Sequence, residues 1–158
     1  ISEVAHDAIK EEKLKPKHRV NLKVTYHDPC FLGRLSEKYI PWNGKIEAYG
    51  VHVPPKPWRR GTYGVYEAPR EVFKAMPGIN LAEMPRNAEN AFCCGAGGGV
   101  PAVAPDFTRW TASERLDEAQ STGAEALVSA CPFCQDAFSE PKKKMKYLDF
   151  TELVVRSL

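Results

Sequence analysis

Short runs of apolar residues alternate along the chain with longer segments in which apolar residues recur every three or four positions. The short runs predict strands at 21–26, 79–84, 90–93 and 125–130, and a last strand followed by a helix within 147–158. The longer segments, with an apolar residue every three or four positions, predict helices at the N-terminus, from Phe31 onward, within 67–78, at 106–121 and from Cys131. Strands that alternate with helices in this way predict an α/β fold, a short, mostly parallel sheet flanked by helices.

Three of the predicted helices show a clear apolar face. At the N-terminus this face carries Val4, Ala8 and Ile9. The helix within 67–78 places Val72, Phe73 and Met76 on one side and ends at Pro77 and Gly78, and the helix at 106–121 does the same with Ala112, Leu116 and Ala119. We expect these faces to lie against the sheet.

Residues 36–66 interrupt the alternation. This segment is rich in proline, glycine and tryptophan, which predicts a long irregular insertion with one short hairpin. Its aromatic residues Trp42, Trp58 and Tyr63 occur with Lys56, Arg59 and Arg60, a combination that is common at protein interfaces, so docking of a partner protein is one hypothesis for the insertion. Packing on its own domain is the other.

Composition limits the class of protein. The chain has 158 residues, 43% of them hydrophobic, and a formal net charge of +2, which argues against nucleic acid as a partner. It has no apolar run long enough for a membrane span and no signal-peptide core, so a cytoplasmic or peripheral location is expected. Because the chain lacks an initiating Met and begins inside a predicted helix, we interpret residues 1–158 as one domain of a larger subunit.

Five cysteines follow predicted strands, where the loops of a parallel sheet form sites: Cys30, Cys93, Cys94, Cys131 and Cys134. A disulfide framework is disfavoured because the count is odd and the chain is large enough to fold without one. A metal-free C-x-x-C dithiol site would leave three cysteines idle, and a zinc site would leave one. A polynuclear iron–sulfur cluster would use all five thiolates.

Glycines follow the adjacent cysteine pair. The loop "CCGAGGG" lacks the spacing of a nucleotide-binding motif. We expect Gly95, Gly97 and Gly98 to bring backbone close to a cofactor, to donate N–H hydrogen bonds to its sulfur atoms and to leave room for a substrate.

Three motifs, "HDPCFLGR", "AFCCGAGGG" and "ALVSACPFC", resemble the CCG cysteine-rich domain of the B and D subunits of heterodisulfide reductase. The 36 residues between Cys94 and Cys131 are typical of that family, whereas the 62 between Cys30 and Cys93 are more than usual, and the insertion accounts for the excess. With the segments "GRLSEKYIPW" and "GVYEAPRE", the chain looks most like the C-terminal part of DsrK, the K subunit of the Dsr membrane complex, or a related heterodisulfide-reductase-like subunit.

This resemblance implies a noncubane [4Fe-4S] cluster held by the five cysteines, which cleaves a disulfide or trisulfide on a small sulfur-carrier protein, DsrC-like, in dissimilatory sulfur metabolism. It also implies partner subunits in a redox complex at the cytoplasmic face of a membrane, and cubane clusters upstream that supply electrons. The isolated fragment is then not expected to turn over. A zinc-stabilised interaction domain, into which an isolated recombinant chain could also load zinc, and a metal-free thiol–disulfide oxidoreductase remain alternatives.

Charged residues near the motifs suggest further roles. His27, three residues before Cys30, either transfers protons at the site or hydrogen-bonds the turn. Arg34, Arg70 and Arg115 either offset the charge of a cluster or lie at the solvated surface. The basic run Lys142–Lys146 is interpreted as a solvated loop.

Overall fold

The computed structural model describes residues 1–141 and 145–158. Within these residues, four strands form one parallel sheet in the order β4 (Ile79–Leu81), β1 (Leu22–Tyr26), β5 (Ala126–Ser129) and β6 (Lys146–Asp149). Tyr26 lies opposite Val128 and Ser129 opposite Asp149, so β1 and β5 end at the same edge of the sheet. The predicted α/β fold with a mostly parallel sheet is therefore confirmed.

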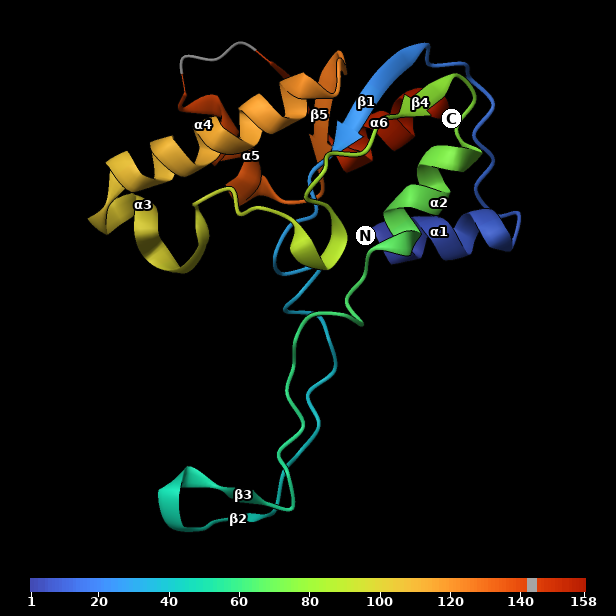
Figure 1. The fold of residues 1–158 in the computed structure, drawn as a ribbon. Coiled ribbons are helices and arrows are strands. Elements are labelled where there is room, and N and C mark those ends of the chain that lie inside the picture. Colours follow the sequence, from blue (N-terminus) through green and yellow to red (C-terminus); the bar gives the residue numbers. More distant parts are fainter. Residues whose placement is uncertain (142–144) are drawn as a thin grey trace.

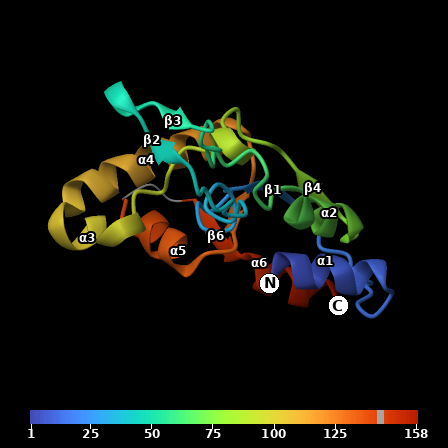
Figure 2. The ribbon, with the colours of Figure 1, turned by 90° about the horizontal axis from the view of Figure 1, so that it is seen from below.

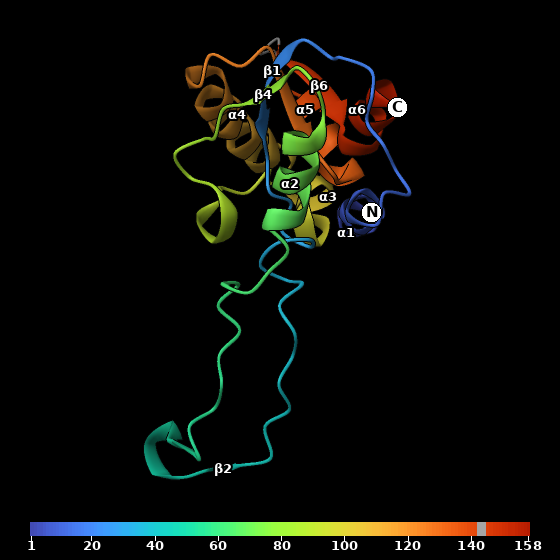
Figure 3. The same cartoon turned by 90° about the vertical axis from the view of Figure 1, so that its right-hand side faces the viewer.

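Helices cover both faces of this sheet (Figure 1). The helices α4 (Pro105–Ser121) and α5 (Pro132–Ser139) lie on one side, and α1 (Ser2–Lys10), α2 (Glu67–Ala75) and α6 (Phe150–Ser157) lie on the other, as the two rotated views also show (Figures 2 and 3). The short helix α3 (Val100–Val103) leads into α4. Two buried clusters result, and the one beneath α4 and α5 includes Cys94 and Cys134.

The apolar faces predicted for two helices are the buried ones. Val72, Phe73 and Met76 are almost fully buried, and so are Ala112, Leu116 and Ala119. The prediction for α1 was partly wrong, because Val4 is 65% exposed while Ala5 and Ile9 contact the core. In so short a helix the apolar pattern leaves its rotation about the axis poorly determined.

Two predicted elements do not form. Residues from Phe31 make turns instead of a helix, because the carbonyl of Leu32 accepts a hydrogen bond from the N–H of Val65 at 3.1 Å and the chain is diverted into the insertion. Residues 90–93 are not a strand: Asn90 ends a short 3₁₀-helix, Ala88–Asn90, and residues 91–93 are irregular. There, the side chain of Arg34 donates to the carbonyls of Glu89 and Ala91, taking the place of a neighbouring strand.

The insertion projects from the domain as an extended arm, residues 36–66, beyond the edge of the sheet at which β1 ends (Figures 1 and 3). Its tip is a two-stranded antiparallel hairpin, β2 (Lys45–Ile46) and β3 (His52–Val53), joined by a 3₁₀ turn at Ala48–Gly50. The ring of His52 packs at a tilt against Trp42 and edge-on against Trp58, so the arm has a small aromatic cluster of its own. The side chains of Tyr39, Tyr49 and Tyr63 are nevertheless exposed.

No helix in the part of the chain that the structure describes is long and apolar enough to cross a bilayer. The predicted solvated loop at Lys142–Lys146 falls mainly on residues 142–144, outside the described residues.

Candidate functional site

Three loops meet at the edge of the sheet where β1 and β5 end, and each carries cysteines. Cys30 follows β1 by four residues, and Cys131 follows β5 by two and caps the N-terminus of α5, whose first turn carries Cys134. Cys93 and Cys94 lie in the irregular loop before the 3₁₀ turn Gly97–Gly99. The parallel register of β1 and β5 thus brings together thiols that lie about a hundred residues apart.

All five predicted cysteines line one pocket of about 180 Å³: Cys30, Cys93, Cys94, Cys131 and Cys134. Phe31 and Phe133 form apolar walls, and the glycines 97–99 form the remaining side. Phe31 and Phe133 are themselves largely exposed, at 65% and 63%. The pocket therefore opens to solvent between two aromatic rings while its floor lies within the domain.

The sulfur atoms form two close pairs. The Sγ atoms of Cys30 and Cys93 are 4.0 Å apart, and those of Cys94 and Cys134 are 3.3 Å apart. Cys94 and Cys134 are buried, whereas the other three cysteines are half-buried. The adjacent residues Cys93 and Cys94 therefore contribute to different pairs, as the irregular backbone between them allows.

In the metal-free protein, hydrogen bonds between neighbouring thiols raise the pKa values of Cys30 and Cys94. The pKa of Cys30 is raised well above its usual value because its thiol donates to Cys93, and burial acts in the same direction. The hydrogen bond between Cys134 and Cys94, together with burial, raises the pKa of Cys94 to about 12. Such a site favours binding of a metal cation, because the cation replaces the thiol protons and reduces the repulsion between neighbouring thiolates.

Positive charge and N–H donors already face the sulfur atoms. The guanidinium of Arg34 donates to Cys30 Sγ at 3.2 Å, and the backbone N–H of Gly95 donates to Cys93 Sγ at 3.3 Å. The N–H of Ala96 lowers the pKa of Cys94, against the larger raising effects. These groups favour thiolates over thiols.

The glycines of the loop do different things. Gly95 has φ +86°, and a Cβ there would lie 2.9 Å from Cβ of Thr111, so the loop can approach α4 only with glycine. A Cβ on Gly97 or Gly98 would meet nothing within 4 Å. Gly97 and Gly98 therefore leave open space beside the cysteines, and the expected approach of their backbone to a cofactor stays a prediction.

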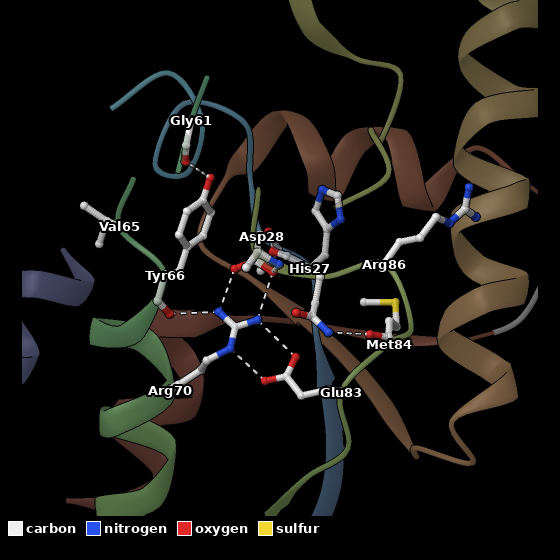
Figure 4. A network of polar contacts seen from close by, with 12 residues as sticks. His27, Asp28, Gly61, Val65, Tyr66, Arg70, Glu83, Met84 and Arg86 are labelled. Carbon is white, nitrogen blue, oxygen red and sulfur yellow. Dashed lines mark hydrogen bonds and ion pairs between the residues drawn. The ribbon is translucent and has the colours of Figure 1, made fainter. Parts of the chain in front are cut away.

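The three arginines considered in the sequence all lie near this edge of the sheet, but they contact different groups. Arg34 contacts a cysteine sulfur, whereas Arg70 and Arg115 are buried in ion pairs with carboxylates. Arg70 forms paired hydrogen bonds with Asp28, of 2.8 and 3.0 Å, and with Glu83, of 2.7 and 3.0 Å (Figure 4). None of the three is the solvated surface residue that was the other interpretation.

Asp28 is a residue whose role the sequence alone did not reveal. Its side chain is only 2% exposed, and besides Arg70 it binds the backbone N–H of Ala88 at 2.8 Å. It therefore ties the turn before Cys30 to the loop that leads to Cys93. The signal in the sequence was an aspartate next to proline directly after a buried strand, which is common in turns and so not specific.

His27 lies beneath the pocket and is fully buried. Its Nδ1 accepts a hydrogen bond from Nε of Arg115 at 3.1 Å, and its ring packs edge-on against Phe138. Burial, followed by the charges of Arg115 and Arg34, lowers the pKa of His27 well below its usual value. The imidazole is therefore neutral, and its Nδ1 is bound to Arg115 rather than to the turn.

Two open grooves adjoin the cysteine pocket. One, of about 480 Å³, shares Ala96, Gly99 and Phe133 with it and carries Arg109 and two acidic residues. The other, of about 560 Å³, shares Cys93 and Gly97 and is walled by Phe107 and Trp110. A substrate bound in either groove would lie beside the cysteines.

The residues present fit a thiolate-bound metal cluster. Five soft sulfur ligands line one pocket, and its opening leaves space for a further ligand. Two of the sulfur atoms already accept hydrogen bonds, Cys30 Sγ from Arg34 and Cys93 Sγ from the N–H of Gly95. A ring nitrogen of His27 lies within 4.8 Å of the Sγ atoms of Cys94 and Cys134. These features suit several metals, so similarity to known proteins becomes relevant.

A family model described as a cysteine-rich domain, CCG, matches residues 49–139, which include Cys93, Cys94, Cys131 and Cys134. The chain is also 38% identical to the D subunit of the dihydromethanophenazine:CoB–CoM heterodisulfide reductase of Methanosarcina mazei, over the whole chain and 33% of that protein.

Two further similar proteins are named as other oxidoreductases or their subunits. The "probable iron-sulfur-binding oxidoreductase FadF" of Bacillus subtilis is 29% identical over 99% of the chain and 19% of its own length. The B subunit of the fumarate reductase (CoM/CoB) of Methanothermobacter marburgensis is 30% identical over 85% of the chain and 21% of its own length. The chain thus spans a third or less of the relatives it matches.

Proposed function

The chain belongs to the family of CCG cysteine-rich domains, and on that premise we propose that it is the iron–sulfur redox domain of a heterodisulfide-reductase-like oxidoreductase. The observation that carries the proposal is the convergence of five sulfur atoms on one pocket. The names of the relatives, which are oxidoreductases or their subunits, support the redox class. The finer identification with DsrK is part of the proposal.

The proposed cofactor is a [4Fe-4S] cluster of the noncubane type, with Cys30, Cys93, Cys94, Cys131 and Cys134 as its ligands and Gly95, Gly97 and Gly98 beside it. Such a cluster would supply electron transfer and an iron site with affinity for sulfur. The chain's own share is to hold the thiolates, to donate hydrogen bonds from Arg34 and Gly95, and to shape the space between Phe31 and Phe133. Arg34 also offsets the negative charge of several thiolates.

The proposed substrate is a disulfide or trisulfide carried by a small sulfur-carrier protein of the DsrC type. Reduction of a disulfide takes two electrons and two protons and releases two thiols. A pocket that opens between exposed aromatic rings, with two grooves beside it, suits a sulfur atom presented on another protein. Electrons would come from clusters in other parts of the subunit, within a redox complex at the cytoplasmic face of a membrane.

Reconstitution of the chain with iron and sulfide under anaerobic conditions tests the proposed function. We expect about four irons per chain and an electron paramagnetic resonance signal in the thiol-treated, oxidised protein. Zinc titration of the metal-free chain is the matched comparison. Tight binding of a single zinc ion without uptake of iron would contradict the proposal and favour a zinc-stabilised interaction domain.

The arm is proposed to dock on a neighbouring subunit of the redox complex. Residues 36–66 carry five basic residues and only two acidic ones, although the whole chain has a net charge of only +2. A two-stranded hairpin is marginal on its own, and this one leaves Ile46, Tyr49 and Val51 exposed at its tip. The complementary surface would be acidic, with apolar recesses for these side chains.

A double substitution in the arm tests this docking. Arg59 donates to the carbonyl of Leu35 and helps to form the base of the arm, so the exposed residues Trp58 and Arg60 are the better targets. We expect Trp58→Ala with Arg60→Glu to reduce incorporation of the full-length subunit into its complex by tenfold or more, measured by native mass spectrometry.

The comparison variant is Lys17→Glu, which changes an exposed cation outside the arm and is expected to assemble normally. The cluster spectrum of the arm variant is also expected to be unchanged, because neither Trp58 nor Arg60 lines the cysteine pocket. Normal assembly of the arm variant would contradict the docking proposal.

A further inference from the structure

His27 has an unusual set of contacts for a buried histidine. Its side chain has 0% exposure and its Nδ1 is bound to Arg115, yet within residues 1–141 and 145–158 no hydrogen-bond partner is in reach of Nε2. A buried polar atom without a partner is costly, and a similarly shaped apolar residue would avoid that cost. A hydrogen-bond partner for Nε2 would therefore have to come from outside the described residues.

Arg115 determines which ring nitrogen carries the proton. A guanidinium in a protein stays protonated and can only donate, so Nδ1 of His27 must present its lone pair to Arg115. The guanidinium itself is held in place by Glu118 at 2.7 Å and by the carbonyl of Arg86 at 2.8 Å. A neutral imidazole with an accepting Nδ1 carries its hydrogen on Nε2.

The imidazole ring of His27 lies close to two of the sulfur atoms. A ring nitrogen of His27 and the Sγ atoms of Cys94 and Cys134 all lie within 4.8 Å of one another, and all three residues are buried. Such a trio could be taken for a metal site with a histidine ligand. A protonated Nε2 has no lone pair to offer a metal ion, so the contact with Arg115 argues against that role.

We propose that His27 is a positioning residue whose Nε2–H donates a hydrogen bond to the sulfur of the centre held by Cys94 and Cys134, with Arg115 selecting the tautomer. The inference rests on the proposed function, because it needs a thiolate-bound centre in the pocket. Hydrogen bonds to sulfur stabilise the more negative, reduced state of such a centre and raise its reduction potential. The pair His27 and Arg115 would thus tune the potential at which substrate is reduced.

The tautomer can be measured without iron. In the metal-free chain, two-bond ¹H–¹⁵N correlation spectra of the imidazoles distinguish Nε2–H from Nδ1–H. We expect His27 to be the Nε2–H tautomer in the wild type and to lose that fixed tautomer in Arg115→Met. A wild-type His27 that is protonated on Nδ1, or on both nitrogens, would overturn the inference.

The reduction potential tests the hydrogen bond itself. In the reconstituted chain, we expect His27→Leu to keep its iron but to lower the ratio of reduced to oxidised cluster about tenfold at a fixed potential, a shift of about 59 mV for one electron. His27→Gln keeps an N–H donor at a similar reach and should restore most of the potential. His52→Leu, a change of a histidine in the arm, is the control and should leave the potential unchanged.

The outcomes separate the two proposals. A wild-type chain that takes up no iron would overturn the proposed function and this inference with it. A wild type that takes up iron, together with a His27→Leu cluster at the wild-type potential, would overturn this inference alone. Loss of iron from both His27→Leu and His27→Gln would also overturn it, because a ligand rather than a hydrogen-bond donor would have been removed.

Discussion

Replacing Cys94 by alanine is expected to lower the iron content of the reconstituted chain from about four atoms to less than one. Cys94 is 5% exposed and its Sγ lies 3.3 Å from that of Cys134, so water cannot readily replace it as a ligand. Its neighbour Cys93 belongs to the other sulfur pair, next to Cys30. Loss of Cys94 would therefore separate the two halves of the site.

Iron and sulfide analysis, together with the paramagnetic signal, measures this effect. The matched control is Ser139→Ala at the end of α5, an exposed change that should leave the iron content unchanged. Thermal unfolding of the metal-free variant checks the fold, because alanine fits the space of a cysteine. A Cys94→Ala chain that still binds four irons would show that the adjacent cysteine pair does not act as two ligands.

Replacing Arg70 by methionine is expected to lower the free energy of unfolding by about 3–5 kcal/mol, the usual cost of breaking a buried ion pair. The substitution would leave the carboxylate of Asp28, 2% exposed, without its cation, and Glu83 would lose its partner as well. Because Asp28 also binds the N–H of Ala88, the loop that leads to Cys93 should loosen. Denaturant unfolding of the metal-free chain measures the change.

The same helix offers a control for this prediction. Lys74 pairs with Glu71 at the surface of α2, and Lys74→Met is expected to have no measurable effect on stability. Adding Asp28→Asn to Arg70→Met should restore part of the loss, because the uncompensated charge disappears while an acceptor for Ala88 remains. A loss below about 1 kcal/mol in Arg70→Met would contradict the assignment of a buried ion pair.

Regular elements were predictable wherever the local pattern and the final environment agree. The apolar residues 126–128 lie between the breakers Gly123 and Pro132, and they form most of the fully buried strand β5. The spacing of Ala112, Leu116 and Ala119 likewise identified the buried side of α4. The irregular backbone at 31–36 and 90–93 was not predictable, because the carbonyls of Leu32 and Ala91 accept hydrogen bonds from Val65 and Arg34, which are distant from them in sequence.

The sequence by itself determined the α/β class and drew attention to five cysteines, because periodicity and residue type depend on local neighbours alone. Only the tertiary structure decided which sulfur atoms lie close together, because the parallel register of β1 and β5 determines which loops meet. It also decided what Asp28, His27 and Arg115 do. Buried hydrogen bonds join residues as many as 102 positions apart, as between Ser129 and His27. A local sequence pattern cannot show which distant residue will satisfy a polar group that folding removes from water.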